Sequence, residues 1–298
     1  MKLQALRLSL LVLATLGSLA ASAIEAPAAP ASAPSSAALS SVPALPVEEI
    51  LARNAAARGG QDAWRKLQGF QYSGKLDAGR QRPQADSQFG SPTISAKERR
   101  RERIVRDREL DSAPVISLPF QLYVARGRKS RLEVTVQDKV AVQVYDGSQG
   151  WKLRPYLGAG HPVEPYSEEE LKLAADQADI EGWLMEAHSK GLQVVGEGVE
   201  DVEQRPAYKL RITLANGDQR HVWVDAQSFL DVKVEGARKF DGKIKPMYTV
   251  LKDYRTVDGV TIPFLMETSM PGYRDTERLV IEQAKVNPVM PAGGFGKP

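Results

Sequence analysis

The sequence contains no cysteine and only three histidines among its 298 residues. Without cysteine the chain can form no disulfide, no thiolate nucleophile, no cysteine-ligated zinc site and no iron–sulfur cluster. Imidazole chemistry is limited to His161, His188 and His221, which lie far apart in the sequence and form no local ligand pair. We therefore expect the protein to use neither a metal ion nor another cofactor.

The sequence also has little net charge, +3 in total. Lys2 and Arg7 supply most of this excess, so the chain beyond residue 23 is close to neutral. Proteins that bind nucleic acid usually carry a large positive charge or a basic surface with interleaved aromatic residues. The basic run 97–108 mixes seven basic with three acidic residues and has no aromatic residue. This pattern favours a solvated or partner-docking surface, and we expect no nucleic-acid partner.

Long apolar runs are missing except at the N-terminus. There Lys2 and Arg7 precede an apolar stretch, 8–19, that ends in Ala21-Ser22-Ala23, which is the pattern of a secretory signal peptide. The stretch is shorter than the roughly 20 residues that a membrane-spanning helix needs. We expect residues 1–23 to be removed by cleavage after Ala23, leaving a soluble exported protein. No cysteine follows the cleavage point, so a lipid-anchored form is not expected.

The mature chain is predicted to be a linker followed by one domain. Of the 23 residues in 24–46, 18 are Ala, Pro or Ser, a composition that buries too little apolar surface to fold. The domain 47–298 begins with predicted helices at 47–58 and 61–67, separated by Gly59-Gly60. A charged section, 80–112, interrupts the domain, and the sequence alone does not decide whether it forms a strand or a helix.

Beyond residue 69 the apolar residues alternate with polar ones, which indicates β-strands. The alternating positions are Leu132, Val134 and Val136, then Val140, Val142 and Val144, and then Tyr208, Leu210, Ile212 and Leu214. The dipeptides Asn216-Gly217, Asp241-Gly242 and Asp258-Gly259 favour tight hairpins. The pattern predicts an antiparallel meander with one apolar face, closed by helices at 167–178, which opens with a Ser167/Glu170 capping box, and at 181–190.

Catalytic motifs are missing from the sequence. It contains no His-Glu-x-x-His, no Gly-x-Ser-x-Gly and no complete phosphate-binding loop. His221 shares a strand face with Trp223 and Asp225, but strand positions two apart share a face whatever their role. We therefore predict no catalytic residue. The four tryptophans, at 64, 151, 183 and 223, suit either a packed core or the lining of a ligand cavity.

Short motifs follow one another in a fixed order through most of the chain. They include Arg58-Gly59-Gly60-Gln61 with Trp64, Tyr72-Ser73-Gly74, Tyr145-Asp146-Gly147 with Gly150-Trp151, Ala207-Tyr208-Lys209-Leu210, Val224-Asp225-Ala226, and Asp258-Gly259 with Pro263. Their order resembles the LolA/LolB-like superfamily of outer-membrane lipoprotein-sorting-type proteins. The resemblance covers about 50–298, and relative to it the section 80–112 looks like an insertion.

The resemblance implies a mainly β (α+β) fold: an unclosed antiparallel β-barrel, or half-barrel, whose concave apolar face is covered by helices. It also implies a monomeric periplasmic carrier that binds lipid or lipid-anchor acyl chains for transport or sorting towards the outer membrane. Its partners would be an inner-membrane transporter or an outer-membrane acceptor. The candidate ligand-binding residues are Leu132, Val134, Val142, Trp151, Trp183, Met185, Leu210, Ile212, Val232, Phe264 and Met266.

Two other functions remain open at this stage. A sensor or adaptor on the same scaffold would act through a protein partner, with the charged section 80–112 as its docking surface. An enzyme would need a site assembled from residues distant in the sequence, which no motif reveals.

Overall fold

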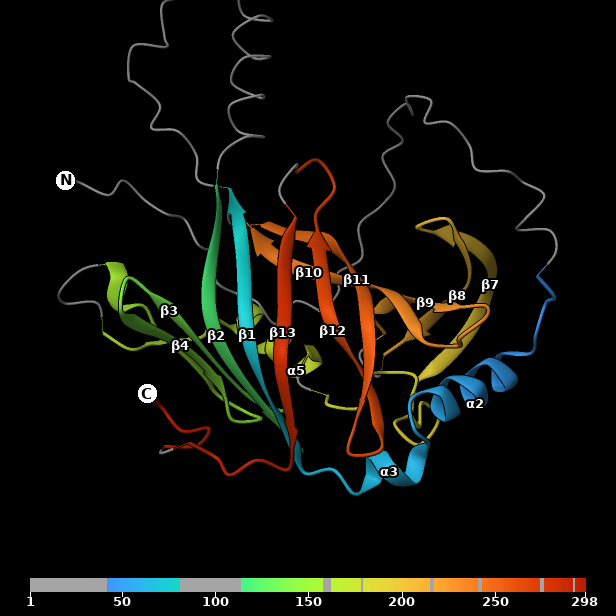
Figure 1. Ribbon diagram of the computed structural model, residues 1–298, viewed down its shortest axis with the longest axis horizontal. Coiled ribbons are helices and arrows are strands. Elements are labelled where there is room, and N and C mark those ends of the chain that lie inside the picture. The colour runs from blue at the N-terminus through green and yellow to red at the C-terminus, as the bar shows by residue number, and fades with distance from the viewer. Residues whose placement is uncertain are drawn as a thin grey trace, which may run out of the picture.

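The computed structural model describes residues 42–80, 114–157, 162–177, 179–214, 217–240, 243–273, 276–291 and 293–298 (Figure 1). The expected signal peptide, the linker up to residue 41 and the insertion from residue 81 onwards lie outside these ranges. Within them, no helix combines the length and the apolar composition needed to cross a membrane.

Two short helices open the described chain, as predicted. Helix α2, Val47–Ala57, follows Pro46 and carries Glu48 and Glu49 in its first turn. Their negative charges interact favourably with the positive end of the helix dipole. Gly59 and Gly60 end this helix with φ angles of 103° and 85°, and α3, Gln61–Arg65, follows directly. A Cβ atom at Gly59 would lie 2.1 Å from the Gly259 carbonyl oxygen, so the α2 end contacts the sheet closely there.

In the part of the chain that the structure describes, thirteen strands form one antiparallel sheet. They are β1 Gly69–Arg80, β2 Val115–Ala125, β3 Lys129–Val136, β4 Lys139–Tyr145, β5 Gly150–Leu153, β6 Glu164–Pro165, β7 Gln193–Val202, β8 Arg205–Thr213, β9 Gln219–Asp225, β10 Asp231–Phe240, β11 Lys243–Val257, β12 Val260–Ser269 and β13 Glu277–Val286. Their order in the sheet is β6-β5-β4-β3-β2-β1-β13-β12-β11-β10-β9-β8-β7. Because β6 and β7 are the two edges and do not pair, the sheet is an unclosed barrel, which confirms the predicted fold class.

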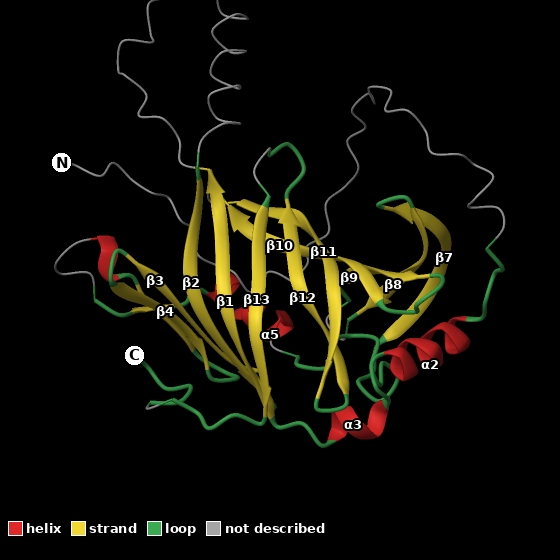
Figure 2. Ribbon diagram, viewed as in Figure 1, coloured by secondary structure: helices red, strands yellow, loops and turns green. Residues whose placement is uncertain are grey.

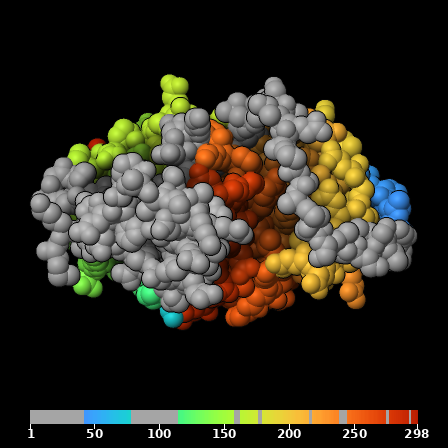
Figure 3. All heavy atoms as spheres, turned by 90° about the horizontal axis from the view of Figure 1, so that it is seen from above, coloured from blue at the N-terminus to red at the C-terminus, as the bar shows by residue number. Residues whose placement is uncertain are grey.

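The first and last strands pair in the middle of the sheet, where Figure 1 shows β1 beside β13. From this pair, β2 to β6 form one arm and β7 to β12 form the other. Seen from above, the C-terminal strands lie between these two arms (Figure 3).

Tight hairpins join neighbouring strands. The predicted turn Asp258-Gly259 lies between β11 and β12, with φ angles of 46° and 86° and Val257 paired to Val260. Gly217, with a φ of 83°, lies between β8 and β9, whereas Asp241-Gly242 is outside the described residues. The pairs Gln137-Asp138 and Glu203-Gln204 make equivalent turns with positive φ, although neither contains glycine.

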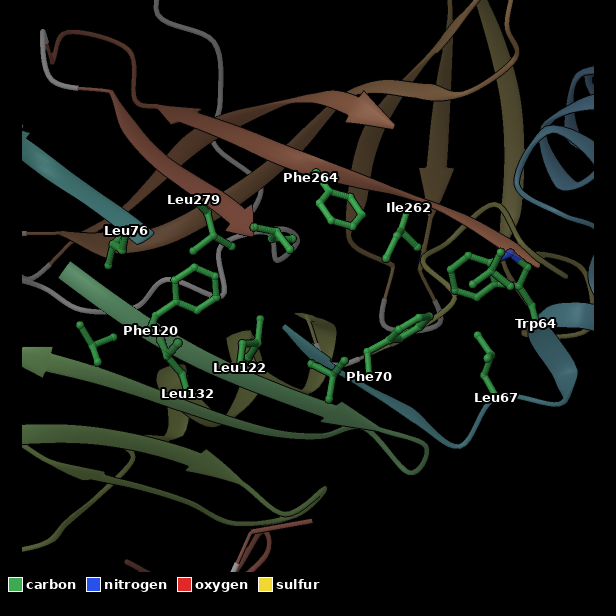
Figure 4. Close-up of a cluster of buried hydrophobic side chains, with 14 of the residues drawn as sticks. Trp64, Leu67, Phe70, Leu76, Phe120, Leu122, Leu132, Ile262, Phe264 and Leu279 are labelled. Carbon is green, nitrogen blue, oxygen red and sulfur yellow. The ribbon is translucent and has the colours of Figure 1, made fainter. Parts of the chain in front are cut away.

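Side chains directly opposite each other on paired strands share one face of the sheet. One such row joins Met266, Leu279, Leu76 and Leu118 across four strands. A second row joins Ala284, Tyr72, Leu122 and Leu132, and a third joins Ile281, Gly74, Phe120 and Val134. We call the face that carries these rows the concave face; Figure 4 shows its side chains converging from several strands.

The buried apolar residues fall into two main clusters. The first cluster contains Trp64, Leu67 and the concave-face residues of β1, β2, β3, β12 and β13. The second contains Ile50 and Leu51 of α2 with concave-face residues of β8, β9 and β10. Helix α2 contributes to both clusters through Ile50, Leu51 and Ala55 and therefore joins the two arms.

Helix α5, Glu168–Gln177, packs against β4, β5 and β10 and so spans from one arm to the other (Figure 2). The predicted capping box opens it: the Glu170 amide donates to Ser167 Oγ at 3.3 Å, and the Ser167 amide donates to Glu170 Oε2 at 2.7 Å. Its apolar contacts to Tyr145 and Tyr166 form a small cluster that is separate from the two main clusters.

The predicted helix at 181–190 is wrong. Residues 180–191 form a series of turns, because Gly182 and Glu186 have φ angles of 72° and 53° and interrupt any helical run. We call these turns, together with the residue on either side of them, the 179–192 segment. This segment nevertheless covers the concave face as expected. Met185 belongs to the first main cluster, whereas Trp183 and Leu184 belong to the second.

Candidate ligand-binding face

The concave face of the central strands is apolar but is not completely buried. Leu76 and Leu132 are each 1% exposed, whereas Tyr72, Met266 and Ala284 on the same rows are only partly buried. These three side chains pack against the first main cluster and keep some solvent-accessible surface.

Eight of the eleven predicted ligand-binding residues lie in or against the two main clusters. The first cluster contains Leu132, Val134, Met185 and Phe264, with Met266 packed against it. The second cluster contains Trp183, Leu210 and Ile212. Both groups lie on the concave face of the sheet or on its cover, and contact of each residue with a ligand stays a prediction.

The other three predicted residues lie on the opposite, convex face. On β3, Arg131 and Glu133 flank Leu132 and so lie on the face opposite to it. Val142 pairs with Glu133, and Trp151 pairs with Val144, which pairs with Arg131, so Val142 and Trp151 share that convex face. Val232 packs with Trp223 and Tyr248 at a register shift between β9 and β10.

Val142 is buried although it lies on the convex side. The Arg131 guanidinium donates from Nη1 to the Gly294 carbonyl at 3.2 Å, which places the C-terminal residues against this face. An alternating apolar pattern therefore predicts that β4 has a buried face, but it does not tell which face of the sheet is concave.

Sequence reasoning missed a buried polar cluster formed by Asn54, Arg58, Asp231 and Tyr254. Arg58 is 7% exposed; its Nη1 donates to the Glu181 carbonyl at 2.8 Å, and its guanidinium lies 4.4 Å from the Trp64 ring centroid. The signal was present in α2. Asn54 and Arg58 continue the helical spacing of Ile50, Leu51 and Ala55, so they lie on the buried side of the helix.

Asp231 is the acceptor at the centre of this cluster. Asn54 Nδ2 donates to Asp231 Oδ1 at 2.8 Å, and the Tyr254 hydroxyl donates to the Asp231 carbonyl at 2.7 Å. Burial raises the pKa of the Asp231 carboxyl, and the charge of Arg58 and the hydrogen bond from Asn54 only partly offset that rise. The distance from Arg58 Nη1 to Asp231 Oδ2 is 3.8 Å, which is too long for a hydrogen bond.

Ion pairs hold the cover on the sheet. Glu181 of the 179–192 segment, with a side chain 5% exposed, binds Arg126 Nη2 at 2.6 Å and Lys190 Nζ at 3.2 Å. Helix α5 is held at both of its sides. Lys152 Nζ of β5 lies 2.7 Å from Glu170 Oε1, and Lys172 Nζ lies 3.1 Å from Asp218 Oδ2 beside the β8–β9 turn.

His221 lies on the convex face. Its Nε2 is 3.2 Å from Glu197 Oε2, and its Nδ1 contacts Glu235. The Asp225 carboxylate instead accepts from Ser228 Oγ at 2.8 Å and pairs with Arg205 at 2.9 Å. His221 and Asp225 therefore have different partners. Across the described ranges, no group of three or more His, Asp and Glu side chains is arranged to hold a metal ion.

The fold and the concave face define a helix-covered β half-barrel whose concave face is apolar and partly exposed. No protein-family model matches the sequence, and no curated protein matches it. Among solved structures, a LolA superfamily protein from Nitrosomonas europaea superposes with a TM-score of 0.50 at 12% identity, covering 85% of this chain and 99% of that chain. The chain therefore shares the overall fold of that protein.

Two further solved structures give lower scores. An outer membrane lipoprotein-sorting protein domain from Vibrio parahaemolyticus has a TM-score of 0.48 and 11% identity, with 85% of this chain and 98% of that chain covered. A DUF1329 family protein from Desulfovibrio piger has a TM-score of 0.48 and 12% identity, with the same coverage.

Proposed function

We propose that this protein is a periplasmic carrier that binds the acyl chain of a lipid or a lipid anchor against its concave face. The observation that carries the proposal is that Tyr72, Met266 and Ala284, on two neighbouring apolar rows of the concave face, remain partly exposed beside buried neighbours. The LolA-type fold and the signal-like N-terminus support the same role, and a transfer partner in the inner or outer membrane would load or unload the chain.

Burial of an acyl chain supplies enough free energy for this role. Each methylene removed from water contributes about 0.8 kcal/mol, so ten methylenes give on the order of 8 kcal/mol before the costs of binding. A net binding free energy of that size would correspond to a dissociation constant of about 1 μM, and the costs of binding make the affinity weaker than this. Such an affinity holds the cargo during transfer and still allows release.

Helix α5 is the part of the cover best placed to move. Its apolar contacts form a small separate cluster, and two ion pairs attach it to the arms. Elements with few buried apolar contacts belong to the low-stability part of a structure. Movement of α5 would open the concave face without disturbing either main cluster.

Blocking the interior tests the proposal. Ala284 lies opposite Tyr72 on the concave face, so Ala284→Phe should fill accessible space and lower the affinity for a fluorescent fatty-acid probe about tenfold or more. The matched control is Gln283→Phe, because Gln283 is exposed on the other face of the same strand. Circular dichroism must show both variants folded.

Native mass spectrometry of gently purified protein is the second test. A carrier should retain bound lipid or take up an added acyl chain at a one-to-one ratio. If the wild-type protein neither retains lipid nor binds any acyl probe, the carrier proposal fails, and a sensor acting through a protein partner becomes the better hypothesis.

A further inference from the structure

Positive charge is concentrated at the α3 end of the sheet. Residues 61–68, which include α3, and residues 125–129, which join β2 to β3, together contain five basic side chains and one acidic side chain. The two segments lie side by side, because the Arg126 amide donates to the Gln68 carbonyl at 3.0 Å and Arg126 Nη2 donates to the Trp64 carbonyl at 2.8 Å. Figure 1 shows α3 at the end of the sheet where β1 begins.

Two of these cations are neutralised by carboxylates of the 179–192 segment. Arg65 pairs with Glu186, and Arg126 Nη2 lies 2.6 Å from Glu181 Oε1. We call the other three the basic patch: Lys66, Arg128 and Lys129. All three are exposed, and among the residues that the structure describes no carboxylate forms an ion pair with any of them.

This lack of carboxylate partners distinguishes the basic patch from most of the sheet. On the described strands most exposed basic side chains pair with an acid, as Lys75 does with Glu282 at 3.3 Å. The β4–β5 turn contacts the β2–β3 turn and carries one acid, Asp146. The Asp146 carboxylate instead accepts hydrogen bonds from the amides of Ser148 at 2.8 Å and Gln149 at 2.7 Å. The basic patch therefore presents positive charge to solvent.

An exposed apolar residue lies close to the same segments. The Gln68 amide donates to Asn287 Oδ1 at 2.6 Å, and Val289, two residues further along, is 94% exposed. Cations beside an exposed apolar side chain suit an anionic bilayer, where lipid phosphates attract the cations and the acyl region accepts the apolar group. Interfaces with proteins are instead centred on packed aromatic anchors, and neither α3 nor the β2–β3 turn exposes an aromatic side chain.

We propose that the basic patch docks this protein on the surface of an anionic phospholipid bilayer, with Lys66, Arg128 and Lys129 binding lipid phosphates. Trp64 and Leu67 of the adjoining segment belong to the first main cluster, so this contact brings the α3 end of the concave face to the membrane (Figure 4). The inference adds a docking surface to the proposed carrier function, and it does not require an acyl chain to be bound.

Sedimentation with vesicles tests the proposal. The exported protein is mixed, at physiological ionic strength, with vesicles of phosphatidylcholine alone or of phosphatidylcholine and phosphatidylglycerol in equal amounts. One cation near an anionic surface strengthens binding about fivefold, which corresponds to about 1 kcal/mol, so three cations should favour the anionic vesicles by about a hundredfold. Added salt should reduce this preference, because it screens exposed charges.

Two single substitutions that remove equal charge separate the basic patch from the charge of the whole protein. Lys129→Gln, at the start of β3, should weaken binding to the anionic vesicles about fivefold. Lys139→Gln is the matched control, because Lys139 is exposed just beyond the other end of β3. It lies roughly 25 Å from Lys129 along the strand, which exceeds the Debye length of about 8 Å, so it should change binding by less than about twofold.

A double variant enlarges the effect. Arg128 has a φ of 57°, a left-handed conformation that Asn also tolerates, so Arg128→Asn removes the charge and keeps the turn. Arg128→Asn combined with Lys129→Gln should weaken binding to anionic vesicles about 25-fold. Circular dichroism must show that every variant is folded, and the double variant should bind a fluorescent fatty-acid probe as the wild type does.

The outcomes separate the two proposals. If the wild-type protein binds both kinds of vesicle equally well, or if Lys129→Gln and Lys139→Gln weaken binding to the same extent, the membrane-docking surface is refuted and the carrier proposal is unaffected. If the wild-type protein binds anionic vesicles through the basic patch but binds no acyl probe, the carrier proposal fails and the docking surface stands.

Discussion

Replacing Glu181 with Gln should destabilise the protein near neutral pH and have little effect in acid. Glu181 is nearly buried and binds two cations: Arg126, directly after β2, which attaches the 179–192 segment to the sheet, and Lys190 within the segment itself. Removing one partner of a buried ion pair costs about 3–5 kcal/mol. Gln can still accept one hydrogen bond, and Arg126 is 37% exposed and can be hydrated, so we expect a loss of about 1–3 kcal/mol.

The pH dependence follows from the pKa of Glu181. Burial raises this pKa, but the hydrogen bonds and charges of Arg126 and Lys190 lower it by more than burial raises it. The pKa of Glu181 in the folded protein is therefore below its ordinary value of 4.5. The carboxylate therefore stabilises the folded state above the unfolded pKa, and this stability is lost as the pH falls through the lower folded pKa. The difference between wild type and variant should be largest near pH 7 and decrease as the pH falls below the ordinary glutamate pKa and through the lower folded pKa.

Urea unfolding followed by tryptophan fluorescence measures this difference, because Trp183 lies in the 179–192 segment itself. The control is Glu168→Gln, at an exposed position in the first turn of α5. A free energy of unfolding for Glu181→Gln that equals that of the control, or a deficit that is the same at neutral and acid pH, would refute the reasoning.

Three other predictions test separate features. Gly59→Ala should cost about 1–3 kcal/mol and lower the melting temperature more than Gly60→Ala, since both have positive φ but only Gly59 has a carbonyl oxygen 2.1 Å from the added Cβ. Equal losses would contradict this. Lys172→Ala should speed probe release in stopped-flow measurements at a stability cost of about 1 kcal/mol or less; an unchanged release rate would mean that α5 does not gate the site. The intact mass of the exported protein should correspond to a chain beginning at Ile24, and a retained segment 1–23 would show that the signal was misread.

Local sequence signals predicted much of the fold. The Ser167/Glu170 capping box, the glycines at the end of α2 and the turn Asp258-Gly259 all have the expected structures, because each depends on a few neighbouring residues. Glu186 shows the limit of such signals. Its φ is positive although it is not glycine, and Met185 and Trp183 just before it pack into different clusters; no local pattern predicts either feature.

The candidate site was harder to predict for a related reason. Val142 and Leu132 both belong to alternating apolar runs, yet their side chains lie on opposite faces of the sheet. Both are buried, because β4 is covered on its convex side as well as on its concave side. The spacing of Arg58 from Asn54 and Leu51 places it on the buried side of α2, so its burial was predictable from the sequence. Its neighbour Asp231 was not, because Asp231 lies far along the chain.

The pairing of β1 with β13 has a consequence for the order of folding. Tyr72 and Ala284 are neighbours in the middle of the sheet but about 200 residues apart in the chain, so their contact closes a very long loop. Such non-local contacts slow folding. The arm β7 to β12 can assemble from successive hairpins, but the centre of the sheet cannot close until β13 is available. Strand β1 therefore stays unpaired on one side until then, and the final folding step depends on the last strand of the sheet.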